Sequence, residues 1–224
     1  MSIHLQKEIT NLKKSILSLG AIVEERVWQA VKSISERDPD LARHVINADL
    51  EIDQMEVSIE EECLKVLALH QPVAIDLRYI VAILKINNDL ERIGDLASNI
   101  SRQAEYMFNL DMIKIPPEFP IIAEKTQDML KKSLDALVNL DTGLAQEVRE
   151  EDDEVDSLNR IMYDRVKEVI RKDLNQLDAM IHMRSASKNL ERIADLATNI
   201  AEDVIYTCRG EIVRHKTGDL DECS

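Results

Sequence analysis

The sequence predicts an all-α fold built as two tandem, duplicated antiparallel three-helix bundles, and two observations carry this prediction. The 224 residues are dominated by Leu, Ile, Ala, Glu, Lys and Met, which lose little on entering a helix, whereas Gly and Pro number only five each. Residues 90–100 read LERIGDLASNI and residues 190–200 read LERIADLATNI, with nine of eleven positions identical. A repeat of this kind indicates a duplicated structural unit.

A weaker match extends the repeat toward the N-terminus at an offset of 103 residues instead of 100. It aligns Asp49 and Asp53 with Asp152 and Asp156. An apolar stripe that begins at Ile52 likewise aligns with one that begins at Val155. The change of offset predicts a three-residue difference in length between the second and third helices of the two units.

The first unit is expected to hold three helices. Apolar residues spaced three and four apart predict an amphipathic helix over Ile3 to Arg37. Asp38-Pro39 ends this helix, because Pro cannot continue a helix but fits the start of the next. The second helix is then expected from Pro39 to Leu69, before Gln71-Pro72, and the third from Val73 to Phe108.

The second unit repeats this plan, and a proline-rich segment separates the two. Its helices are expected at Pro120–Asn139, Asp141–Lys172 and Leu177–Tyr206. Three of the five prolines fall between residues 111 and 120. We therefore expect bundles over 1–110 and 121–208, a linker over 111–120 and a polar tail over 209–224. A single six-helix bundle stays open, although the prolines disfavour it.

The negative charge of the chain disfavours some classes of binding partner and favours others. With 43 acidic and 28 basic residues, the formal net charge is −15. Such a surface repels nucleic acid and anionic lipid and favours metal cations and basic protein surfaces. No run approaches the roughly 18 apolar residues of a membrane-spanning helix, and no signal peptide is visible. We expect a cytoplasmic protein without membrane insertion and without a nucleic-acid partner.

Acidic residues recur at helical spacing in both units. Glu91, Asp95 and Asn99 are four residues apart, and on a helix they share one face. The second unit has Glu191, Asp195 and Asn199 at the same spacing. The second helices add the pairs Asp49 with Asp53 and Asp152 with Asp156. Each unit is thus expected to carry two acidic pairs on neighbouring helices, away from the apolar stripe.

These carboxylates suit a metal cation, although a structural explanation stays open. Stacked carboxylates repel each other, and a hard divalent or trivalent cation between them reverses that repulsion. The alternative is a solvated face, or one paired with Arg92 and Arg192. The first helices of the two units share few identities, whereas the third helices keep both acids and the Asn. This contrast favours a binding role.

The sequence gives no sign of an enzyme. It contains no Gly-rich phosphate loop, no GxSxG motif and no HExxH motif. None of the five histidines lies three or four residues from the acidic pairs of the third helices, so a di-iron enzyme lacks its His ligands. We expect no catalytic residue and no organic cofactor.

At these residues the chain resembles the PhoU family, the bacterial regulators of phosphate uptake. The resemblance rests on the two LERI motifs, on HQPVAIDLRYI at residues 70–80 and on DLEIDQMEVSIEE, which begins at Asp49. It implies two similar three-helix bundles and a non-enzymatic, cytoplasmic homodimer. Such a protein acts between the phosphate-specific ABC transporter and a sensor histidine kinase, and it represses phosphate-starvation genes when phosphate is plentiful.

The resemblance also implies surface sites for iron, zinc or another divalent or trivalent cation on E(D)xxxD motifs. The ligands implied are Glu91, Asp95, Glu191, Asp195, Asp49, Asp53, Asp152 and Asp156, with Asn99 and Asn199 beside them. Two alternatives stay open. One is a carboxylate-bridged metalloenzyme, and the other is a helical scaffold whose acids dock a basic partner.

Overall fold

The computed structural model describes residues 3–110 and 114–210, and every regular element in these ranges is a helix. The first half comprises α1 (Ile3–Glu36), α2 (Pro39–Asn47), α3 (Asp49–His70) and α4 (Ala74–Phe108). The second half comprises α5 (Glu118–Asn139), α6 (Thr142–Lys172), the short 3₁₀ helix η1 (Leu174–Gln176) and α7 (Leu177–Arg209).

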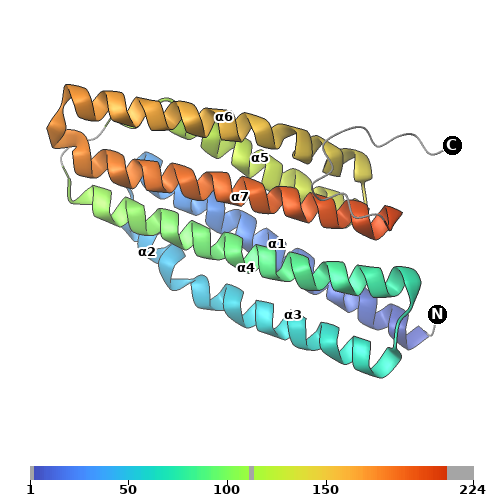
Figure 1. The fold of residues 1–224 in the computed structure, drawn as a ribbon. Coiled ribbons are helices and arrows are strands. Elements are labelled where there is room, and N and C mark those ends of the chain that lie inside the picture. Colours follow the sequence, from blue (N-terminus) through green and yellow to red (C-terminus); the bar gives the residue numbers. More distant parts are fainter. Residues whose placement is uncertain (1–2, 111–113, 211–224) are drawn as a thin grey trace.

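The helices form two antiparallel bundles that lie side by side along their length (Figure 1). In the first half α1, α3 and α4 pack together, with α2 against α1 and α4, and in the second half α5, α6 and α7 do so. Between the halves, α4 runs beside α7 in the opposite direction, and α1 contacts α5. The predicted all-α fold of duplicated bundles is confirmed.

The start of the second helix in each unit follows from an Asp cap. The Asp38 carboxylate accepts hydrogen bonds from the backbone N–H groups of Asp40 and Leu41, both at 3.0 Å. Asp141 does the same for Gly143 and Leu144, at 2.9 and 3.1 Å. Each carboxylate satisfies N–H groups that have no partner within the helix.

The helix expected from Pro39 to Leu69 is in fact two helices, so this prediction was wrong. The chain breaks at Ala48, whose N–H donates to the carbonyls of His44 and Val45 at 3.1 and 3.2 Å. Asn47 and Ala48 stand where the second unit has Glu150 and Glu151, and Asn is a poorer helix former than Glu. The matching helix α6 runs unbroken over 31 residues.

Other boundaries differ from the expected ones by a few residues. Helix α5 begins at Glu118 instead of Pro120, and the ring of Pro120 is accommodated in its first turn. Helix α7 follows a 3₁₀ turn and ends at Arg209 instead of Tyr206. Residues 111–113 of the expected linker and 211–224 of the expected tail lie outside the described residues.

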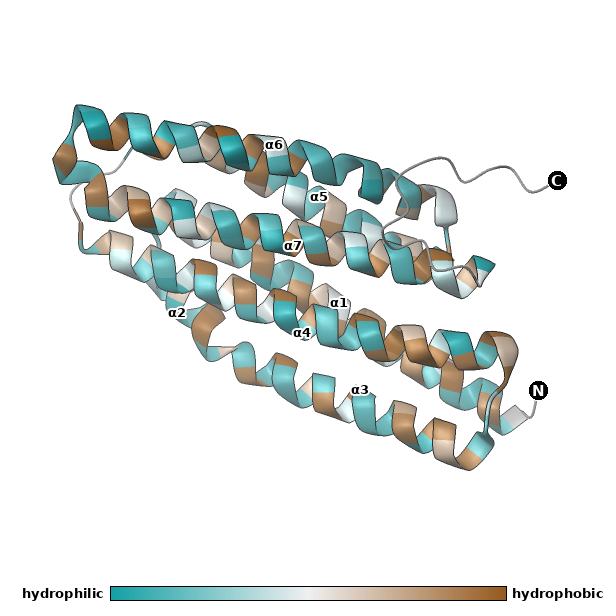
Figure 2. Cartoon of the chain, viewed as in Figure 1, coloured by the Kyte–Doolittle hydropathy of each residue, from teal (hydrophilic) through white to brown (hydrophobic). Residues whose placement is uncertain are grey.

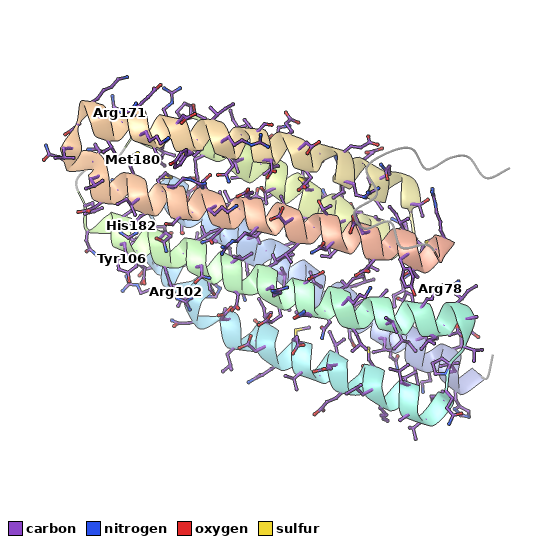
Figure 3. The ribbon with its side chains drawn as sticks, in the orientation of Figure 1. Arg78, Arg102, Tyr106, Arg171, Met180 and His182 are labelled. Atoms are coloured by element: carbon purple, nitrogen blue, oxygen red, sulfur yellow. The ribbon has the colours of Figure 1, made fainter. Side chains whose placement is uncertain are left out.

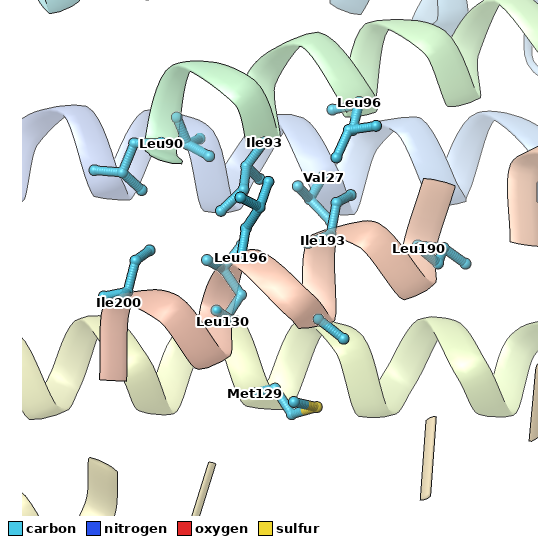
Figure 4. Close-up of a cluster of buried hydrophobic side chains, with 14 of the residues drawn as sticks. Val27, Leu90, Ile93, Leu96, Met129, Leu130, Leu190, Ile193, Leu196 and Ile200 are labelled. Carbon is cyan, nitrogen blue, oxygen red and sulfur yellow. The ribbon is translucent and has the colours of Figure 1, made fainter. Parts of the chain in front are cut away.

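Apolar side chains from both halves form one buried cluster. Figure 2 shows polar residues on the outward surfaces and apolar residues where helices meet. Figure 4 shows the part of the cluster where α4 and α7 meet, with Met129 and Leu130 of α5 beside them. Because the outward faces are polar, none of the described helices is long and apolar enough to cross a membrane.

Candidate functional site

The acids of the first half lie together along the seam between α3 and α4. We define the first acidic patch as Asp49, Asp53 and Glu56 of α3 with Glu91 and Asp95 of α4. Asp53 acts electrostatically on Asp49, Glu56 and Glu91, which places these carboxylates close to one another. The structure therefore brings together all four acids predicted for this half. Glu56 was missed, although it follows Asp49 by seven residues and so shares its face.

Burial and mutual repulsion perturb this patch. Burial raises the pKa of Glu91, and the negative charges of Asp95 and Asp53 raise it further. Burial also raises the pKa of Asp49, while the Ser98 hydroxyl acts in the opposite direction. These carboxylates lose hydration on folding and gain like-charged neighbours, which disfavours their ionised form. A bound cation would relieve both effects.

A buried amide lies beside the first patch. Asn87 stands four residues before Glu91 on α4 and is only 1% exposed. Its Nδ2 donates to the backbone carbonyl of Glu56 at 2.9 Å and to the Glu56 carboxylate at 3.4 Å. Its Oδ1 is buried without a hydrogen-bond partner among the described residues. An orphaned carbonyl oxygen beside carboxylates is a hard donor available to a cation.

The acids of the second half lie along the seam between α6 and α7. We define the second acidic patch as Asp152, Asp156, Glu191 and Asp195. Burial raises the pKa of Asp152 to about 6, with Asp195 and Asp156 contributing in the same direction. Burial and then Glu191 also raise the pKa of Asp195. All four acids predicted for this half are thus brought together.

The second patch contains its own cation and amide donor. The Lys188 ammonium pairs with the Glu191 carboxylate. The buried Asn159 donates from Nδ2 to the same carboxylate oxygen at 2.5 Å. The Asn159 Oδ1 in turn accepts from Arg184 at 3.0 Å and from Ser187 at 2.8 Å. Sequence reasoning missed these residues because they occupy positions where the two units differ.

The two LERI motifs, 100 residues apart, meet across a groove between α4 and α7. This groove of about 340 Å³ is lined by Arg92, Asp95, Leu96, Asn99, Arg192, Asp195 and Leu196. Leu96 and Leu196 are mostly buried, and Arg92 and Arg192 are exposed. The sequence did not predict this meeting of the motifs, because periodicity within one unit does not say which face packs on the other.

The two asparagines beside the acids have different surroundings. Asn99 is half-buried, and its Oδ1 accepts from Arg102 at 2.8 Å. Asn199 is half-buried on α7.

Figure 3 shows Arg102 one turn before Tyr106 on α4, and Tyr106 beside His182 of α7. The Tyr106 and His182 rings stack with centroids 4.9 Å apart, so this end of the seam is closed by packing.

The donor chemistry of the patches fits a hard cation, whereas their side chains do not converge into a finished site. Among residues 3–110 and 114–210, no three His, Cys, Asp or Glu side chains are grouped so that they could hold a metal ion. The donors are carboxylates and, in the first patch, the orphaned Asn87 oxygen. Oxygen donors of this kind suit Mg²⁺, Mn²⁺ or ferric iron better than softer metals.

Comparisons with known proteins agree with this duplicated architecture. A family model described as "PhoU domain" matches the chain twice, over residues 16–104 and 119–204. The "phosphate-specific transport system accessory protein PhoU homolog" of Pseudomonas aeruginosa is 37% identical over 209 residues, covering 93% of this chain and 86% of that protein. The homolog of Aquifex aeolicus is 35% identical over 212 residues, covering 95% and 96%.

Solved structures show the same fold. The crystal structure of PhoU from Pseudomonas aeruginosa superposes with a TM-score of 0.89 at 36% identity, covering 92% of this chain and 99% of that one. The phosphate transport system regulatory protein PhoU from Streptococcus pneumoniae gives a TM-score of 0.84 at 27% identity, covering 93% and 99%. The chain therefore belongs to the PhoU domain family.

Proposed function

We propose that this chain is a cytoplasmic negative regulator of phosphate uptake and phosphate-starvation signalling. It acts as a non-enzymatic adaptor between the phosphate-specific ABC transporter and a sensor histidine kinase. One observation carries the proposal: both halves match the PhoU domain, and relatives that span nearly the whole chain are named accessory proteins of the phosphate-specific transport system. A duplicated bundle with long exposed helices suits contacts with two partners.

The outer face of α3 supports an adaptor role. Leu50, Val57 and Leu64 are 62%, 50% and 53% exposed, and their spacing of seven places them along one side of the helix. Figure 2 shows apolar stretches along α3. Aligned apolar side chains on an outer face are typical of a protein contact. We assign this face to partner docking. Separately, we expect the chain on its own to be a homodimer, which light scattering would measure.

Deletion of the gene tests the regulatory role. Alkaline phosphatase activity in phosphate-rich medium is expected to rise in the deletion strain and to return to the repressed level when the intact chain is restored. The L50Q/V57Q/L64Q variant is expected to fold and to leave the enzyme derepressed. Ile161→Gln, an equally exposed change on α6, is the control and keeps repression. Normal repression in the deletion strain would contradict the proposal.

We further propose that the acidic patches bind iron, zinc or another divalent or trivalent cation. Asp49, Asp53, Glu91 and Asp95 would hold it in the first half, and Asp152, Asp156, Glu191 and Asp195 in the second. A bound cation would supply positive charge that draws the two helices of a patch together. The raised pKa values of Glu91 and Asp195 support this, because burial and neighbouring carboxylates disfavour the ionised form of both side chains.

Elemental analysis of protein purified without chelators tests the metal proposal. Stoichiometric metal is expected in the wild type, with a loss in the variant carrying Glu91→Gln, Asp95→Asn, Glu191→Gln and Asp195→Asn. If the wild type contains less than stoichiometric metal, and the variant contains the same amount, the metal proposal fails and the acids are better explained as docking sites for a basic partner. A metalloenzyme is disfavoured because His182 contacts Gln103 and Tyr106 and His44 contacts Arg26, and none of these partners belongs to either patch.

A further inference from the structure

The first helices of the two halves, α1 and α5, form a groove of about 500 Å³ between them. They contact each other at Lys13, whose Nζ donates to the Val138 carbonyl at 2.8 Å. They also meet at Gly20, where a Cβ would lie 2.8 Å from Cδ2 of Leu134. Later residues of α1 thus meet earlier residues of α5, so the helices are antiparallel. Figure 1 shows α1 and α5 behind α4 and α7, which places this groove on a different side from the groove between the LERI motifs.

The groove is lined by residues that match in pairs at the offset of 103. The pairs are Ala21 with Glu124, Glu24 with Gln127, Glu25 with Asp128, and Trp28 with Lys131. The two halves therefore contribute the same positions, as they do to the groove between the LERI motifs. The side chains are not alike, however. Because the helices are antiparallel, Trp28 and Glu124 belong to one end of the groove, and Ala21 and Lys131 belong to the other.

Trp28 is a large aromatic side chain that the fold leaves open. It is 50% exposed, although it is the one tryptophan in a chain with few aromatic residues. Its ring already attracts a cation, because Lys32 Nζ lies 4.6 Å from the ring centroid. Tryptophan and arginine are the residues that most often anchor protein contacts. A half-exposed Trp28 in a groove is thus suited to receive a side chain of a partner.

The charge of the groove selects the kind of side chain. Four carboxylates and one ammonium group line it, which leaves a net of three negative charges. Asp128 is already paired with Lys132 at 2.7 Å, whereas Glu24 and Glu124 stand on opposite walls. Such a surface repels nucleic acid and anionic lipid and attracts a cationic protein segment. A guanidinium group fits best, because it stacks on an aromatic ring and binds carboxylates through paired hydrogen bonds.

We propose that the α1–α5 groove docks an arginine-containing basic segment of a partner protein. A guanidinium group of that segment stacks on Trp28 and binds the carboxylates of Glu24 and Glu124. Lys131 repels a second cation at the other end and so sets the direction in which the segment lies. This surface is separate from the acidic patches and from the outer face of α3. The inference goes beyond the proposed regulatory role and holds whether or not the chain regulates phosphate uptake.

A nona-arginine peptide labelled with fluorescein serves as the probe for the full chain. Its anisotropy measures binding, and the emission of Trp28 reports whether the peptide occupies the groove. Both signals are expected to change together, and nona-lysine is expected to bind more weakly because an ammonium group lacks the planar, stacking surface of a guanidinium. Trp28→Ala should lower the affinity by about 5-fold, whereas Trp28→Phe keeps an aromatic face and should retain most of it.

Two charge variants separate the groove from the general acidity of the chain. E24Q/E124A gives both positions the residues of their matched counterparts and should lower the affinity by about 5- to 10-fold. E60Q/E61Q removes the same charge from exposed positions on α3 and should change the affinity by less than about 2-fold. Circular dichroism confirms that every variant is folded.

Either of two results would overturn the groove as a docking site. One is an equal loss of affinity in both charge variants, and the other is a rise in anisotropy that leaves Trp28 emission unchanged. Each would show that the peptide binds the acidic surface without preference for the groove. Repression of alkaline phosphatase is measured independently, so failure of this test leaves the regulatory proposal in place, and normal repression in the deletion strain leaves the groove in place.

Discussion

Gly94 and Ala194 occupy the same position in the two LERI motifs and face different neighbours. A Cβ on Gly94 would lie 2.8 Å from Cδ1 and 3.2 Å from Cγ2 of Ile52 on α3. The position matched to Ile52 in the second half is Val155, which lacks that Cδ1. The two differences therefore compensate, because a larger residue on one helix accompanies a smaller one on its neighbour.

A double-mutant cycle tests this compensation. Gly94→Ala gains helix propensity but overpacks against Ile52, and we expect a net loss of about 1 kcal/mol in the free energy of unfolding. In a chain that already carries Ile52→Val, Gly94→Ala is expected to be more favourable by about 1 kcal/mol than it is in the wild type. Urea denaturation of the four proteins measures both values. Strict additivity would show that the two positions are independent.

The raised pKa of Asp152 should make the stability of the protein depend on pH. Its pKa is about 6 in the folded protein, against an ordinary value of 3.8. The Asp152 carboxyl therefore binds a proton more tightly in the folded state than in the unfolded state. This proton binding stabilises the fold fully below about pH 4, and the stabilisation is lost as pH rises through about 6. Asp152→Asn should be more stable than the wild type at pH 7.5, with the gap closing toward pH 4.

Thermal unfolding in the presence of EDTA measures this effect without interference from cations. The unfolding temperatures of the wild type and Asp152→Asn are compared at several pH values between 4 and 7.5. A gap that stays constant across this range would contradict the assignment.

The capping Asp residues Asp38 and Asp141 stabilise the helices that they begin. Asp38→Ala and Asp141→Ala each remove two hydrogen bonds to backbone N–H groups and should each cost about 1 kcal/mol of stability. Asp40→Ala is the matched control, since its exposed pair with Arg43 contributes at most about 0.5 kcal/mol. Chemical denaturation measures all three. Equal effects at Asp38 and Asp40 would argue against capping.

At the same scale, sequence predicted the helices well but not the break at Ala48. The buried stripe Ala42, Val45 and Ile52 continues across the break, so periodicity gives no signal there. The break is seen only in the local hydrogen bonding, where the Ala48 N–H is shared between two carbonyls, as is common at helix ends. Spacing likewise predicted that each half carries two acidic pairs on neighbouring helices, whereas Lys188 and Asn159 depend on contacts between helices that no single helix pattern contains.

Polar and aromatic interactions near opposite ends of the α4–α7 seam join the two halves of the molecule. Lys85 of α4 pairs with the buried Asp203 of α7 at 3.0 Å and lies over the Tyr206 ring. At the other end Tyr106 stacks on His182. Together with the shared apolar cluster, these contacts imply that the halves are stable as a unit, although the proline-rich segment suggests separate domains.

The two halves are expected to unfold in a single transition. Trp28, the one tryptophan of the chain, lies on α1 in a groove shared with α5, so its fluorescence reports on the contact between the halves, and far-ultraviolet circular dichroism reports on the helices of both. The two urea curves should coincide, as cooperative unfolding requires. Asp203→Ala should shift both curves equally, by about 1 to 2 kcal/mol, because it removes the charge-assisted hydrogen bond between the buried Asp203 carboxylate and Lys85 across the seam. The surface change Glu36→Ala should shift neither by more than about 0.5 kcal/mol. Curves that separate, with the Trp28 signal moving apart from the helical signal, would show that the halves are independent domains and that the α4–α7 seam contributes little to stability.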